Sequence, residues 1–173
     1  MNINFCAQNL VSMLIIMIRV LNNGDNNMEL QLENKQEIID QLNKILELEM
    51  SGVVRYTHYS LMIIGHNRIP IVSWMQSQAS ESLTHATAAG EMITHFGEHP
   101  SLKIADLNET YQHNINDILI ESLEHEKKAV SAYYELLKLV NGKSIILEEY
   151  ARKLIVEEET HIGEVEKMLR KPA

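Results

Sequence analysis

A helical repeat of apolar residues runs through most of this chain and constrains its fold more than any other sequence feature. From residue 35 onward, apolar side chains recur every three or four positions, the pattern of helices that bury one face. The pattern breaks at 65–70, 97–109 and 141–143, and each break contains a glycine and an asparagine, which favour turns. The sequence therefore predicts an all-α fold with four helices, near residues 34–65, 70–96, 111–140 and 144–170.

The lengths of the connections predict how these helices are arranged. The first and third connections are short, so the helices that they join are expected to form antiparallel hairpins. The middle connection, near 97–109, is long enough to run the length of a bundle. We therefore expect an antiparallel four-helix bundle with one long crossover connection. A chain of 173 residues suits one domain, which we place at residues 28–173.

Residues 1–27 differ from the rest of the chain. Their apolar run, 10–20, is shorter than the roughly 20 residues that span a bilayer, and it contains Arg19. A secretory signal would carry positive charge before the apolar run, and that charge is missing here. Met28 has the context of an ordinary start residue. We therefore interpret residues 1–27 as an N-terminal tail or a mis-assigned start, and we expect no membrane association.

Charge and cysteine content exclude two further classes of protein. The formal net charge is −9, and lysine and arginine do not cluster, whereas nucleic-acid binding needs concentrated positive charge. We therefore expect no nucleic-acid partner. Cys6 is the single cysteine, so an internal disulfide cannot form, and a cytoplasmic location is expected.

The two predicted hairpins carry the same residues at the same spacing. EMSGVVRY at 49–56 corresponds to EKKAVSAY at 126–133, and ESLTH at 81–85 corresponds to EEETH at 157–161. The copies lie 77 and 76 residues apart and occur in the same order in both halves. This favours a duplicated hairpin, with a pseudo-twofold site between the halves.

Six ionisable residues fall on positions that the helical spacing turns toward the core. They come from all four helices: Glu49, Glu81, His85, Glu126, Glu158 and His161. The spacing selects Glu126 over Glu124, and it leaves both Glu81 and Ser82 open in the second helix. Carboxylates are almost never fully buried unless they are paired or bind a cation. Carboxylates and imidazoles at one height suit two divalent ions, iron or manganese, with carboxylates bridging them.

Each of these residues alone is more often a core or surface side chain than a ligand, so the joint pattern carries the prediction of a metal site. Tyr56 and Tyr133 lie on the same helix faces. They are interpreted either as core aromatics with a hydrogen-bonded hydroxyl or as groups that assist catalysis next to the metals. The other histidines from the first helix onward are interpreted as ordinary polar residues or as residues that contact the ligands without binding metal: His58, His66, His95, His99, His113 and His125.

The segments LNKILELEMSGVVRY, SLTHATAAGEM and EEETHIGEVEKML resemble bacterioferritin, and the resemblance extends over residues 42–169. It implies a ferritin-like di-iron carboxylate fold with two iron ions per chain. In that family, the residue at Glu49 is a terminal ligand, and Tyr56 lies beside the ligands. The histidines at His85 and His161 each bind one iron, and Glu158 matches a bridging carboxylate.

Three features depart from the bacterioferritin pattern. Ser82 occupies the position of the family's other bridging carboxylate, and Glu81, one residue earlier, is the candidate substitute. Leu83 occupies the position of the methionine that ligates haem, so we do not expect haem there. The sequence ends at Ala173 without the family's short fifth helix, so we do not assume a closed cage of the bacterioferritin type.

The expected function is ferroxidase-type oxidation of Fe(II) by O₂ or peroxide, for iron storage or detoxification, in a homo-oligomer of at least two subunits. Two alternatives stay open. One is a stand-alone di-iron or manganese–iron oxidase that acts on an organic substrate or peroxide. The other is a helical bundle that binds a partner without catalysis. Subunit number separates the first two functions because storage requires a closed shell, and absence of bound metal would favour the third.

Overall fold

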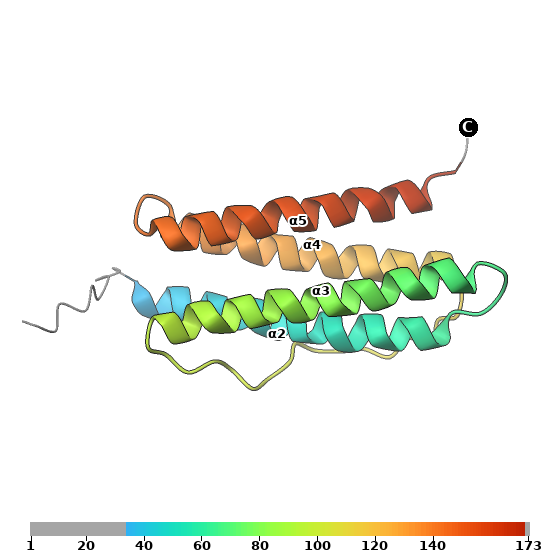
Figure 1. The fold of residues 1–173 in the computed structure, drawn as a ribbon, viewed down its shortest axis with the longest axis horizontal. Helices are drawn as coiled ribbons and strands as arrows, with labels where there is room; N and C mark the ends of the chain where they lie inside the picture. The colour runs from blue at the N-terminus through green and yellow to red at the C-terminus, as the bar shows by residue number, and fades with distance from the viewer. Residues whose placement is uncertain (1–33, 172–173) are drawn as a thin grey trace, which may run out of the picture. The chain divides into compact units, whose positions relative to one another are not determined.

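This computed structural model describes residues 34–171, which form four helices and the segments that connect them (Figure 1). They are α2 (Lys35–Met62), α3 (Arg68–His95), α4 (Ile115–Val140) and α5 (Ile145–Leu169). The helices α2 and α3 form one antiparallel hairpin, and α4 and α5 form the other (Figure 1). The predicted all-α four-helix bundle is therefore confirmed. The predicted tail, residues 1–27, lies outside the described residues.

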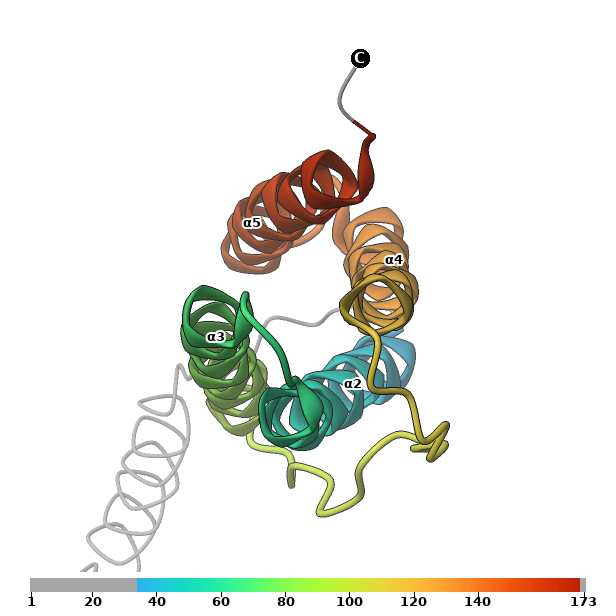
Figure 2. The ribbon, with the colours of Figure 1, turned by 90° about the vertical axis from the view of Figure 1, so that its right-hand side faces the viewer.

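The long connection between α3 and α4 follows the outer side of α2 (Figure 2). The backbone N–H of Ala105 donates to the carbonyl oxygen of Glu47 over 2.9 Å, and the N–H of Ser101 donates to Asn43 Oδ1 over 2.7 Å. This crossover carries the chain to the other end of the bundle, so α4 begins where α2 ends (Figure 1). The two hairpins thereby face each other with α2 packed against α4.

Apolar side chains fill the bundle toward both of its ends. At the end where α2 begins, Leu42 and Leu136 are fully enclosed, and at the opposite end Ile63, Met75 and Ile118 are. Burying a side chain of this size stabilises the fold by roughly 1.5–3 kcal/mol. The helix faces that point away from this core carry charged side chains. None of the helices within residues 34–171 is long and apolar enough to cross a membrane.

The turn between α2 and α3 begins and ends a few residues earlier than predicted. The first helix ends at Met62 rather than near 65, because Ile63 is already extended and Gly65 adopts a φ of 98°. The second helix begins at Arg68 rather than at 70. Pro70 thus lies in its first turn, where the missing backbone N–H costs little because no helical partner exists for it.

The third helix begins at Ile115 rather than near 111. Tyr111 has a φ of 55°, which an α-helix cannot accommodate. The side chain of Asn114 accepts a hydrogen bond of 2.8 Å from the backbone N–H of Asn116 and so caps the new start. The local capping sequence therefore sets this boundary.

Candidate metal centre

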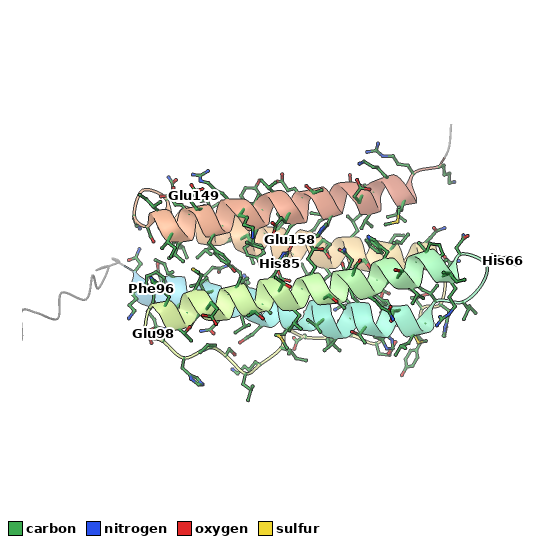
Figure 3. The ribbon with its side chains drawn as sticks, viewed as in Figure 1. His66, His85, Phe96, Glu98, Glu149 and Glu158 are labelled. Carbon is green, nitrogen blue, oxygen red and sulfur yellow. The ribbon has the colours of Figure 1, made fainter. Side chains whose placement is uncertain are left out.

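Three glutamates and two histidines meet midway along the bundle. They come from all four helices: Glu49 (α2), His85 (α3), Glu126 (α4), Glu158 and His161 (α5). Figure 3 labels His85 and Glu158, whose side chains lie close together between α3 and α5. The three carboxylate residues are only 3%, 5% and 2% exposed, in chain order. Carboxyl groups buried this deeply must either be protonated or face a compensating positive charge.

Two groups of three ligand atoms form in this cluster, and Glu158 belongs to both. Glu49, His85 and Glu158 make the first triad, and Glu126, Glu158 and His161 make the second. Within each triad the ligand atoms lie within 4.8 Å of one another. Glu158 Oε1 is 2.8 Å from His85 Nδ1, while Oε2 is 3.9 Å from His161 Nδ1. One oxygen in each triad is the arrangement in which a carboxylate bridges two ions.

Both histidines turn Nδ1 toward the triads and Nε2 toward a glutamate of the opposite helix. His85 Nε2 on α3 is 3.3 Å from Glu157 Oε2 on α5, and His161 Nε2 on α5 is 3.2 Å from Glu81 Oε1 on α3. Each glutamate precedes the histidine of its own helix by four residues, so the two helices exchange these contacts symmetrically. A carboxylate at Nε2 favours the tautomer that leaves the Nδ1 lone pair for a metal.

The two tyrosines cross in the same way between α2 and α4. The hydroxyl of Tyr133 donates to Glu49 Oε1 over 2.8 Å, and the hydroxyl of Tyr56 donates to Glu126 Oε1. Burial raises the pKa of both phenols, and the nearby carboxylates raise it further. The hydroxyls therefore stay protonated and hold the orientation of the two carboxylates.

Protons take up the charge of the cluster where no cation is bound. Burial raises the pKa of Glu49 and, more strongly, that of Glu126, whose carboxyl group also contacts Glu158. Burial alone would lower the pKa of His85, but hydrogen bonds to Glu158 and Glu49 raise it to about 10. In the metal-free protein, the protons on His85 and on the buried carboxyl groups therefore supply the positive charge that bound cations would supply. The oxygen and nitrogen donors present here fit iron or manganese.

A family model of the ferritin-like domain matches residues 39–173. This chain belongs to the ferritin family. The predicted membership among ferritin-like di-iron carboxylate proteins is confirmed by that match together with the fold. A comparison of this ferritin-like chain with curated proteins finds no match.

Solved structures share the fold of this ferritin-like chain. A ferritin-like, diiron-carboxylate protein from Bacillus anthracis gives a TM-score of 0.74 at 21% identity, over 78% of this chain and 96% of that one. A dodecameric thioferritin from Bacteroides fragilis, a bacterioferritin-related protein, gives 0.70 at 23%, over 78% and 84%. The bacterioferritin of Rhodobacter capsulatus gives 0.70 at 19%, over 79% and 85%. At such identities the likeness establishes the fold alone.

Five of the six residues predicted as ligands in this ferritin-like domain contribute to a triad, and Glu81 does not. Its carboxylate contacts His161 Nε2 and lies 3.4 Å from Gln78 Nε2, and it is 36% exposed. Glu157, which sequence reasoning set aside, occupies the equivalent place beside His85. The signal for both was their identical spacing from the histidines, ESLTH and EEETH.

One of the histidines that the sequence left open, as an ordinary polar residue or a neighbour of the ligands, lies next to the centre of this ferritin-like domain. His125 precedes Glu126 on α4 and is buried, with its ring packed edge-on against Tyr56 at 6.1 Å between centroids. Burial, together with the positive charges of Arg55 and Lys128, lowers the pKa of His125 to about 4. The imidazole is therefore neutral at physiological pH. Its position in the internal repeat, opposite Leu48, was the available signal.

Proposed function

We propose that this chain oxidises Fe(II) with O₂ or peroxide at a dinuclear centre and so serves iron storage or detoxification. The observation that supports this most directly is the position of Glu158, which gives one oxygen to each of two neighbouring ligand triads. Two ions that share a carboxylate lie close enough to reduce the same oxidant molecule.

The electrons balance in either version of the reaction. Two Fe(II), one O₂ and two protons yield two Fe(III) and one hydrogen peroxide. Where hydrogen peroxide is the oxidant, two Fe(II), one peroxide and two protons yield two Fe(III) and two water molecules. Each triad offers three protein ligand atoms, so an ion held there would keep coordination sites for the oxidant.

The roles of the residues follow from their contacts. Glu49 and His85 would be terminal ligands of one Fe(II), and Glu126 and His161 of the other. Glu158 would bridge them. Tyr56 and Tyr133 hold Glu126 and Glu49 in place through their hydroxyl groups and lie close enough to supply electrons.

A cavity between α3 and α5 supports access for Fe(II). It has a volume of about 380 Å³, and His85 forms part of its wall together with Glu81 and Glu157. The lining carries the carboxylates of Glu81 and Glu157 and the ammonium group of Lys153, so once His85 has lost its proton the net charge of the lining is negative and attracts a divalent substrate.

The decisive experiment is aerobic titration of the metal-free protein with Fe(II), followed by the absorbance of Fe(III). We expect a rapid phase that ends at about two Fe(II) per chain. Glu158→Ala should abolish this phase because it removes a ligand from both triads. Glu159→Ala is the matched control, since Glu159 lies on the exposed side of the same turn and accepts a surface hydrogen bond from the hydroxyl of Tyr134. Equal rapid phases in the two variants would refute the proposal.

Storage further requires assembly. We infer a homo-oligomer for this chain, and the dodecamer of the Bacteroides fragilis relative supports this inference. Light scattering on freshly purified protein, combined with elemental analysis for iron and manganese, tests it. A monomer that oxidises Fe(II) would favour a stand-alone oxidase over storage.

A further inference from the structure

A second buried tyrosine lies beside Tyr56 on α2. The rings of Tyr56 and Tyr59 meet edge to face, with 6.4 Å between their centroids and an interplanar angle of 83°. Both residues are nearly enclosed, at 1% and 5% exposure. Tyr56 in turn donates a hydrogen bond to Glu126, a member of the second triad. Tyr59 is therefore one aromatic contact away from a side chain that touches the centre.

The hydroxyl of Tyr59 has a carboxylate of its own. It donates to Glu121 Oε2 on α4 over 2.7 Å and accepts a bond of 3.1 Å from Arg55 Nη1. Burial and, less strongly, the bond to Glu121 raise the pKa of Tyr59 to about 12, against the opposing effect of Arg55. The phenol therefore keeps its proton at neutral pH. Because an oxidised phenol is a strong acid, Glu121 is placed to accept that proton when the ring loses an electron.

Glu121 connects this hydroxyl to a cavity beneath the crossover. The cavity has a volume of about 190 Å³, and its lining from α2, α4 and the crossover includes Arg55, Thr110 and Glu121. A proton on Glu121 can leave by this route. The other hairpin lacks the pair, since at the 77-residue offset Tyr59 corresponds to Leu136 and Glu121 to Lys44. The tyrosine and its proton acceptor thus serve one half of the centre.

The reaction with peroxide creates a use for an additional electron donor. Hydrogen peroxide takes up two electrons when it is reduced to water, whereas a chain that holds a single Fe(II) supplies only one. Reduction by one electron alone would release a hydroxyl radical, which damages side chains. A tyrosine in contact with Tyr56 can supply the second electron before that radical forms.

We propose that Tyr59 supplies this electron through Tyr56 and that Glu121 accepts its proton. The proposal rests on the proposed dinuclear centre. One Fe(II), one hydrogen peroxide, one tyrosine and one proton yield one Fe(III), two water molecules and one neutral tyrosyl radical. The O–O bond of the peroxide and the O–H bond of Tyr59 break. Tyr56 gives up an electron and passes its proton to Glu126, then regains the electron from Tyr59 and the proton from Glu126.

The test is freeze-quench electron paramagnetic resonance of the full chain, loaded with one Fe(II) per chain and mixed with one equivalent of hydrogen peroxide. Wild type should give a tyrosyl spectrum, identified by its change in protein that contains ring-deuterated tyrosine. Tyr59→Phe keeps the ring and removes the hydroxyl, so this spectrum should be lost. Trp74→Phe is the matched control and should retain it, because Trp74 touches Tyr56 with the same centroid separation and angle, 6.4 Å and 83°.

A second variant tests the proton acceptor and leaves Tyr59 in place. Glu121→Gln keeps an oxygen that accepts the hydrogen bond, but an amide takes up no proton, so the spectrum should again be lost. The proposal is overturned if Tyr59→Phe or Glu121→Gln gives the wild-type spectrum at the wild-type yield, or if Trp74→Phe loses it. It is also overturned if wild type forms Fe(III) without a tyrosyl radical. Wild type that forms no Fe(III) would instead refute the dinuclear centre itself.

Discussion

The hydroxyl of Tyr133 on α4 donates a hydrogen bond of 2.8 Å to Oε1 of Glu49 on α2, and so joins the two hairpins at the centre of the bundle. The tyrosine is fully buried, so the bond is not exchanged for one to water. Its loss would leave a buried carboxylate short of one donor.

We therefore expect Tyr133→Phe to destabilise the metal-free protein by about 1–3 kcal/mol, the cost of an unsatisfied buried group. Urea unfolding in the presence of a chelator measures this. Tyr134→Phe is the control, because Tyr134 is exposed and its bond to Glu159 lies at the surface. A change within about 0.5 kcal/mol is expected for the control, as for most surface substitutions. Equal losses of unfolding free energy in the two variants would show that the buried hydrogen bond contributes no more than the surface one.

Each histidine should hold one ion. His85→Ala is expected to lower metal content toward one ion per chain by emptying the first triad, and His161→Ala should do so by weakening the second. Elemental analysis after gel filtration measures the content, with the exposed His99→Ala as control. Full metal content in both variants would show that neither histidine is a ligand.

Glu157 and Glu81 each contact Nε2 of the histidine on the opposite helix, so each should affect the ion held by that histidine. Glu157→Ala should lower the affinity for the ion held by His85, and Glu81→Ala should lower the affinity for the ion held by His161, each by about 10–100-fold. Competition with a chelator, measured in single-histidine variants, assigns the affected ion. The sequence alone suggested the opposite for Glu81, as a bridging ligand next to His85. Weakening at His85 by Glu81→Ala would favour that earlier interpretation.

Stability and metal binding should respond to pH in opposite directions. The pKa of His85 is raised to about 10 in the folded protein, from an ordinary value of 6.5. Its stabilising contribution is therefore complete below pH 6.5 and is lost as the pH rises through about 10. The melting temperature of the metal-free protein should fall across this window.

Metal binding must displace the proton from His85 and from the carboxyl group of Glu126, so affinity should rise with pH and binding should release protons. Calorimetry in buffers of different ionisation enthalpy counts the released protons. Binding without proton release would contradict the assignment of these residues as ligands.

Haem should not bind at the position of Leu83. This side chain is 49% exposed and offers only carbon, while Met75 is fully enclosed in the core and cannot reach a cofactor from there. Protein from cells supplied with a haem precursor should show no Soret band. A stoichiometric band that disappears in Met92→Leu would overturn the prediction.

The fold and the five triad residues could be predicted because burial in a helix follows its period. Glu49, Glu126 and Glu158 fall on the same positions as their apolar neighbours, so the spacing alone places them inside. The orientation of Glu81 could not be obtained in this way. It lies at the edge of the buried face, and the position of His161 on another helix decides where its carboxylate turns.

His125 shows a second limit of sequence reasoning. Its equivalence to Leu48 in the internal repeat is a weak signal for an inward position, but the burial of its ring depends on the space left by Gly52 of another helix. The start of α4 had a readable local signal in Asn114, whereas a packing relationship of this kind appears only when the helices are assembled.

The two triads differ in the hairpins that supply them. The second draws Glu126, Glu158 and His161 from the α4–α5 hairpin alone, whereas the first joins Glu49 and His85 of the other hairpin to Glu158. During folding, a hairpin forms from local contacts before distant segments meet, because closing a long loop costs entropy. The second triad can therefore assemble in a half-folded chain, while the first exists only after docking. An ion in the first triad would be bound by ligands from both hairpins and would therefore slow their separation during unfolding.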